Sequence, residues 1–121
     1  LSKDERNAQD AEMLKQKQTV LLQTLNAKSV ELKNKYLSGY SVREEQEARG
    51  LLPTMLLDEI FVAGGYQTMD ELKATIIAKV ETLAIIEGTI IATESDLKSR
   101  IANAKSMQEL DLLSAEIAKW H

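Results

Sequence analysis

The fold is decided by the stretch from Lys3 to Leu37, which reads KDERNAQDAEMLKQKQTVLLQTLNAKSVELKNKYL. It contains neither glycine nor proline, so nothing in it interrupts an α-helix, and a helix of that length extends about 50 Å. Its apolar residues recur at spacings of three, four and seven, which places them on one face. A helix this long is not stabilised by intrinsic propensity alone, so this apolar stripe needs a packing partner. The stripe consists of Ala11, Leu14, Leu21, Leu25 and Leu32.

Two arrangements would cover the apolar stripe, and the sequence leaves both open. The first helix packs against a second long helix of the same chain as a helical hairpin, or it projects and forms a coiled coil with a copy of itself or another protein. Gln18 and Lys28 interrupt the seam, and Lys28 argues against a tightly closed dimer. In the projecting arrangement the predicted interface consists of Leu14, Leu21, Leu25 and Leu32, with Trp120 as a further anchor near the end of the chain.

Four short motifs, each a Ser or Thr followed three residues later by Glu, predict where helices begin. In such a capping box the hydroxyl accepts a hydrogen bond from the third helical N–H, and the Glu carboxylate reaches back to the N–H of the cap residue. Glycines after the apolar segments predict where helices end. The four boxes are Ser2–Glu5, Ser41–Glu44, Thr68–Glu71 and Ser106–Glu109.

These signals predict an all-α fold of about five helices, of which the first and the fourth are long. Pro53 is expected in the first turn of a leucine-rich third helix that is buried. The fourth helix follows Thr68 for about 34 residues, with a break at residues 93–96 left open, and Gly88 is expected to allow close helix approach. The predicted division is a long amphipathic helix over residues 1–40 and a compact helical domain over residues 41–121.

The composition excludes several kinds of chemistry. The chain of 121 residues has no cysteine, which rules out thiol chemistry and cysteine metal sites, and its one histidine, His121, is the last residue. Without another histidine there is no Ser-His-Asp triad and no Glu-x-x-His di-metal motif. The most apolar stretch, Ile76 to Ile91, includes Lys79, Glu81 and Glu87 and is not a membrane span. We therefore predict a protein that is not an enzyme and has no catalytic residue, metal or cofactor.

Charged clusters are expected to be solvated faces. This holds for Glu44, Glu45 and Glu47, and for the lysines of the first helix, which are spread around it. Residues 1–40 hold seven Lys/Arg against five Asp/Glu, and residues 41–121 hold eight against fourteen. This asymmetry is too weak to predict binding to nucleic acid. It leaves one alternative, a helical regulatory or nucleic-acid-associated protein that uses its basic first helix.

From about Val30 onward, the order of helix signals resembles a known kind of protein. A tyrosine-containing turn, Lys35–Ser41, precedes the charged segment Glu44–Arg49, and a proline-led, leucine-rich helix, Pro53–Gly64, follows. A long helix then carries the run Ile76-Ile77-Ala78-Lys79, and the last helix ends at a tryptophan. The pattern is similar to the C-terminal helical region of small tail or tail-fibre-associated assembly proteins of tailed bacteriophages and prophages. Val42 stands where that pattern has a tryptophan.

The resemblance implies a non-enzymatic protein–protein interaction domain that is a tail component or helps a tail or tail fibre to assemble. Its expected partner is a tail fibre or another tail protein, with homo-oligomers through the first helix as a further option. No nucleic acid or membrane is expected among the partners. The implied location is the virion tail or, during assembly, the host bacterial cytoplasm. No signal peptide is visible. The first residue is leucine, which fits the further N-terminal domain that many proteins of this kind carry, and the sequence leaves open whether one precedes this chain.

Overall fold

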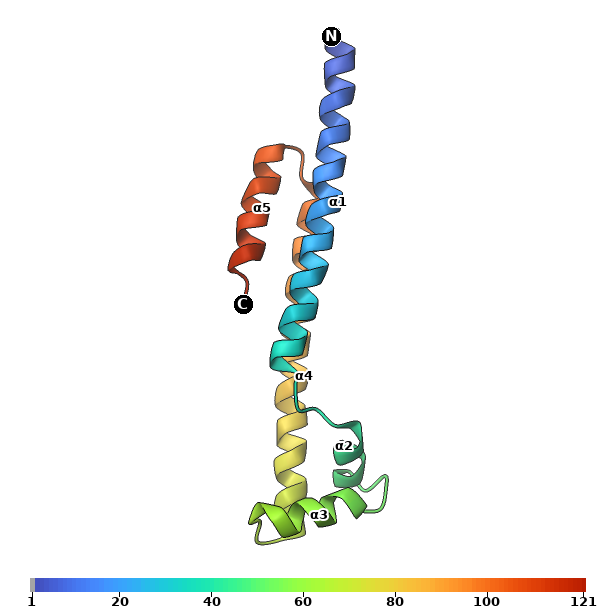
Figure 1. Ribbon diagram of the computed structural model, residues 1–121, viewed down its shortest axis with the longest axis vertical. Helices are drawn as coiled ribbons and strands as arrows, with labels where there is room; N and C mark the ends of the chain where they lie inside the picture. Colours follow the sequence, from blue (N-terminus) through green and yellow to red (C-terminus); the bar gives the residue numbers. More distant parts are fainter. Residues whose placement is uncertain (1) are drawn as a thin grey trace. The chain divides into compact units, whose positions relative to one another are not determined.

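The computed structural model describes residues 2–121, and all regular secondary structure in this range is α-helical (Figure 1). The predicted all-α class with five helices is confirmed, and the first and fourth helices are the longest. The helices are α1 (Lys3–Tyr36), α2 (Val42–Ala48), α3 (Met55–Gly64), α4 (Met69–Asn103) and α5 (Met107–Lys119).

The hydroxyl half of all four predicted capping boxes is formed. Ser2, Ser41, Thr68 and Ser106 each accept from the backbone N–H of the Glu three residues later, at N···O distances of 3.1, 3.3, 3.1 and 3.1 Å. The predicted hydrogen bond from the Glu carboxylate back to the N–H of the cap residue is replaced, in two of the boxes, by a different bond. The carboxylate of Glu71 accepts from Gln67 N–H at 3.1 Å, and that of Glu109 from Lys105 N–H at 2.7 Å. These carboxylates thus bind the residue before the cap, which fixes the entering chain as well as the helix.

The chain folds as two compact units, each with its own core. The first contains the residues up to Lys35 together with Thr89–His121, and the second is Tyr36–Gly88. This grouping differs from the predicted division at residue 40, because α1 shares its core with the C-terminal part of α4 and with α5.

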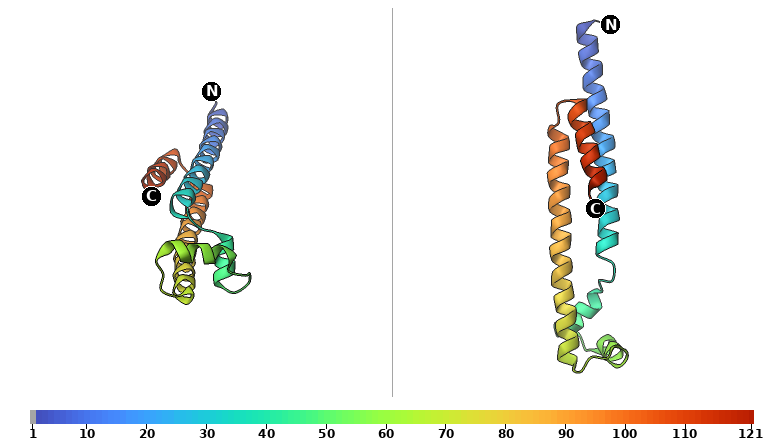
Figure 2. Two further views of the ribbon diagram at one scale, coloured as in Figure 1. Left: turned by 60° about the horizontal axis from the view of Figure 1, so that its bottom comes forward. Right: turned by 90° about the vertical axis from the view of Figure 1, so that its left-hand side faces the viewer.

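In the first unit, α1, the end of α4 and α5 lie side by side (Figure 2). Leucines of α1 meet apolar residues of the other two helices, and partly buried Leu14, Leu22 and Trp120 pack against this core. The buried members are Leu21, Leu25, Leu97, Ile101, Ala104, Leu110, Leu113 and Ile117.

In the second unit, α2 and α3 pack on the first turns of α4, around a core of Ala48, Leu57, Leu72 and Ile76. Helix α3 begins at Met55, so Pro53 precedes the helix and does not lie in its first turn. Leu57 is the one fully buried residue of α3, so the prediction of a buried helix is wrong. Only one face of α3 meets the core, because α2 and α4 cover it from one side.

Helix α4 runs without a break through residues 93–96. The expectation for Gly88 is wrong, since a Cβ atom built on it meets no atom within 4 Å. No close helix approach explains this glycine.

Gly88→Ala should therefore stabilise the chain by about 1 kcal/mol, because glycine has the lower helix propensity and the new methyl group meets nothing. Chemical denaturation followed by circular dichroism measures the change. As a contrast, Gly39 has a φ of +86°, so Gly39→Ala should be destabilising. A loss of stability in Gly88→Ala would contradict this reading of α4.

Candidate functional site

The residues predicted as an interface lie mostly inside the first unit. Leu21, Leu25 and Leu32 are almost completely buried, with at most 3% of their surface exposed. Leu14 and Trp120 are half-buried and pack against the core that holds Leu21 and Leu25, whereas Leu32 is buried further along α1. The chain's own helices thus cover the stripe, as in the intrachain arrangement.

Gln18, one of the two polar interruptions of the stripe, has a structural role. Its side-chain N–H donates to the carbonyl oxygen of Ile101 at 3.0 Å, with the carbonyls of Ala102 and Ala104 at 3.4 Å. The last carbonyls of a helix have no partner within that helix. Gln18 therefore caps the C-terminal end of α4.

A second polar contact holds α1 beside α4. The hydroxyl of Ser29, which is buried, donates to the carboxylate of Glu94. Lys33 Nζ lies 3.9 Å from the same carboxylate. Together with Gln18, this contact ties α1 to α4 at two places.

Three of the six lysines of α1 face carboxylates. Besides Lys33, Lys17 pairs with Asp111 of α5 at 3.6 Å, and Lys28 with Glu31 at 4.0 Å.

Leu21→Ala should lower the free energy of unfolding by about 2–5 kcal/mol, the usual loss for a buried leucine. Leu21→Asp should lower it further, because a carboxylate then enters an apolar core. The matched control is Val20→Asp at the exposed neighbouring position, which should change stability by no more than about 0.5 kcal/mol. Thermal unfolding checks all three. A folded Leu21→Asp variant that has only lost self-association would instead make the stripe a seam between molecules.

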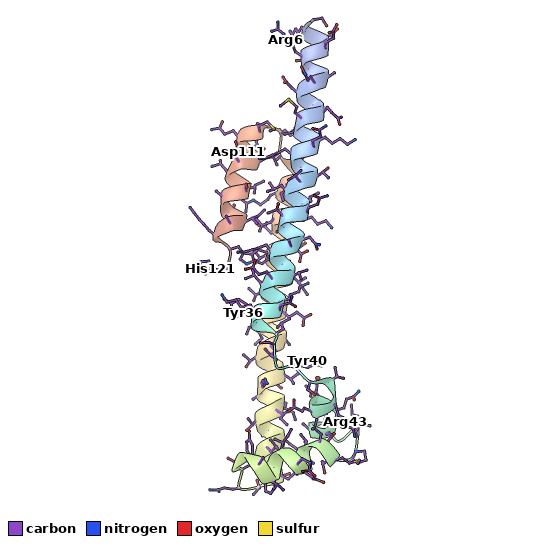
Figure 3. All side chains as sticks on the ribbon, viewed as in Figure 1. Arg6, Tyr36, Tyr40, Arg43, Asp111 and His121 are labelled. Carbon is purple, nitrogen blue, oxygen red and sulfur yellow. The ribbon has the colours of Figure 1, made fainter. Side chains whose placement is uncertain are left out.

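Glu47 was expected on a solvated face, and this prediction is wrong. Its side chain is completely buried, and Oε1 accepts from the backbone N–H groups of Leu56 and Leu57 at 2.9 and 3.0 Å. Oε2 accepts from Arg43 Nε at 2.8 Å, where Arg43 lies on α2 (Figure 3). Thr54, at the cap position of α3, makes no side-chain cap bond, so the carboxylate of Glu47 caps α3 from a neighbouring helix.

Two opposing effects set the acidity of Glu47. Burial alone raises the pKa of its carboxyl, but the hydrogen bonds from Leu57 and Arg43 stabilise the charged form. The net result is a pKa below the usual value of 4.5. As the pH falls, Glu47 of the unfolded chain therefore takes up a proton before Glu47 of the folded chain does. The stability that the charged carboxylate of Glu47 contributes is complete above pH 4.5 and is lost as the pH falls through the lowered pKa.

Glu47→Gln should lower the midpoint of thermal unfolding at neutral pH, because the amide places an N–H group where acceptors are needed. The difference from the wild-type chain should shrink as the pH falls below 4.5. Glu44→Gln, on the same helix, is the control and should have little effect. If the deficit of Glu47→Gln were independent of pH, the charge of Glu47 would not support α3.

The chain's one histidine is the remaining candidate group named from the sequence. His121 lies at the chain end, with Nδ1 2.5 Å from the carbonyl of Lys119. In residues 2–121 no three His, Asp or Glu side chains converge as a metal site. None of the described helices is long and apolar enough to cross a membrane.

A groove of about 260 Å³ lies in the second unit, between the α1–α2 connection and α4. At its edge, the hydroxyl of Tyr40 donates to Glu45 at 2.9 Å. This bond raises the pKa of Tyr40, and the nearby negative charges of Glu45 and Glu87 act in the same direction. The raised pKa keeps the Tyr40 hydroxyl protonated, so that it remains a hydrogen-bond donor to Glu45.

Comparisons with models of protein families, with curated protein sequences and with solved structures gave no significant match.

Sequence reasoning missed the capping role of Glu47. The local signal was weak but present, since Thr54 is not followed by Glu or Gln three residues later and α3 therefore has no capping box of its own.

Proposed function

We propose that this chain is a non-catalytic protein-interaction module of a bacteriophage or prophage tail system, as a tail component or in tail or tail-fibre assembly. The tail setting comes from the resemblance of its helix order, from the turn Lys35–Ser41 to Trp120. The observation that supports a protein-binding role is the exposure of the N-terminal part of α1.

Every residue from Lys3 to Met13 is exposed, although this segment is helical. Arg6 lies in it, and none of the described helices runs beside it (Figure 3). An isolated helix of this length is marginal in water, because too few hydrogen bonds offset its nucleation. A protein partner that packs on this segment would stabilise it.

Where α1 meets the α4–α5 connection, a groove of about 430 Å³ adjoins the exposed segment. Its apolar lining includes Ala11, Met13, Leu14 and Met107, and 51% of Met13 and 39% of Met107 are exposed. Flexible methionines suit surfaces that accept a partner. The buried leucines of the stripe, Leu21, Leu25 and Leu32, are unsuited to this role, because the first unit already covers them.

The test is deletion of the gene in the phage or prophage genome that carries it, followed by electron microscopy of the particles. We expect particles with missing or incomplete tails or fibres, restored by the wild-type gene. Met13→Glu combined with Met107→Glu should fail to restore them, because two charges enter the groove.

Leu112→Glu is the matched control, since Leu112 is exposed on α5 outside the groove. Normal, infectious particles after deletion would contradict the tail proposal. Salt-dependent binding of the purified chain to duplex DNA would instead favour the regulatory or nucleic-acid alternative.

A further inference from the structure

Helix α3 has more apolar residues than its own unit buries. Seven of its ten residues are apolar, yet Leu57 is the one that is fully buried. A helix that is apolar on most sides is normally covered on most sides. Here 68% of Met55 and 83% of Val62 remain exposed.

The exposed residues share one face. Leu57, Ile60 and Phe61 point toward the core of the second unit. Met55 and Val62 are seven residues apart and therefore lie on the same side of the helix. Asp58 and Glu59 are each three or four residues from both, so they lie on that side as well. This outer face of α3, made of Met55, Asp58, Glu59 and Val62, is turned about half a rotation away from the core residues.

The sequence that contains α3, between Arg49 and Lys73, is one-sided in charge. Residues 50–72 contain four carboxylates and no Lys or Arg. The whole second unit holds four Lys/Arg against nine Asp/Glu, whereas the first holds eleven against ten. Three of the four cations have partners, since Arg43 binds Glu47, Arg49 faces Glu45 and Lys79 donates to the carbonyl of Gly39.

We propose that the outer face of α3 is a docking surface for a protein segment that presents apolar side chains together with lysine or arginine. Met55 and Val62 supply apolar contact, and Asp58 and Glu59 supply charges that select a cationic partner. Asp58 also accepts from the hydroxyl of Thr54 at 3.0 Å, which holds one carboxylate in place. This face lies on a different helix from the groove beside Met13, so the two proposals fail independently.

The charge disfavours the other occupants. A second copy docked through the same face would oppose carboxylates with carboxylates. Nucleic acids and anionic lipid surfaces are repelled for the same reason, and helices that lie on membranes carry cations on their polar face. A cationic protein segment is the one occupant for which both the apolar and the charged residues are favourable.

The test uses the full chain and a fluorescent, synthetic amphipathic peptide with leucine on one face and lysine on the other. A second peptide with glutamate in place of lysine is the charge control. We expect the lysine peptide to bind by fluorescence anisotropy at about 0.15 M salt, and the glutamate peptide not to bind. Val62→Lys, and Asp58→Asn combined with Glu59→Gln, should each weaken binding by at least about tenfold.

Two control variants change charge in the same direction at other positions. Leu112→Lys adds a lysine at a position of similar exposure on α5, and Glu81→Gln removes an exposed carboxylate of α4. Both should bind the lysine peptide like the wild-type chain. Circular dichroism confirms that every variant is folded.

Equal binding by all variants, equal binding of both peptides, or no binding would each overturn the proposal. Two further results would overturn it. If the wild-type chain formed a dimer that Val62→Lys separates, the occupant would be a second copy. If the chain bound vesicles of anionic lipid and Val62→Lys strengthened this binding, the occupant would be a membrane.

Discussion

Burial of the α1 leucines against the end of α4 and against α5 is the contact on which the first unit depends. Each buried leucine contributes about 1.5–3 kcal/mol through its apolar surface. A polar contact such as that of Gln18 or Ser29 contributes only about 0.5–1.5 kcal/mol net. The leucines therefore supply most of the stability. The polar contacts decide the register of α1 against α4. A shift of α1 along α4 would break the hydrogen bond of Gln18 to the carbonyl of Ile101 and that of Ser29 to Glu94.

The second unit depends on one carboxylate in a comparable way. Glu47 binds two N–H groups at the start of α3 while Arg43 holds its other oxygen, so α2 and α3 are joined by a charged cap. This cap holds the start of α3 beside α2, while Leu57, Ile60 and Phe61 turn one face of the helix to the core. The opposite face is left exposed with Met55 and Val62, and the proposed docking surface is thus a consequence of how α3 is anchored.

The features that the sequence predicted are local ones. Helix starts could be read from the hydroxyl and Glu of each capping box, because both groups lie within one turn. The features that it did not predict involve residues far apart in the chain. Gln18 contacts a carbonyl 83 residues away, and a polar residue in an apolar seam gives no sign of its partner. The exposure of α3 was also missed, since apolar content predicts burial but does not show how many sides have a neighbour.

The account places partner contacts away from the buried leucines of the apolar stripe. The exposed start of α1 serves the proposed tail function, and the outer face of α3 binds a cationic segment. The central claim of the account is that the stripe is covered within each molecule. Hydrogen exchange of the wild-type chain, followed by mass spectrometry over a series of protein concentrations, tests this most directly. The account predicts that amides around Leu21 and Leu25 exchange as slowly as those around Ile101 and Leu113 at every concentration. Rapid exchange of the α1 amides in dilute solution, with protection only at high concentration, would contradict it and make the stripe a contact between molecules.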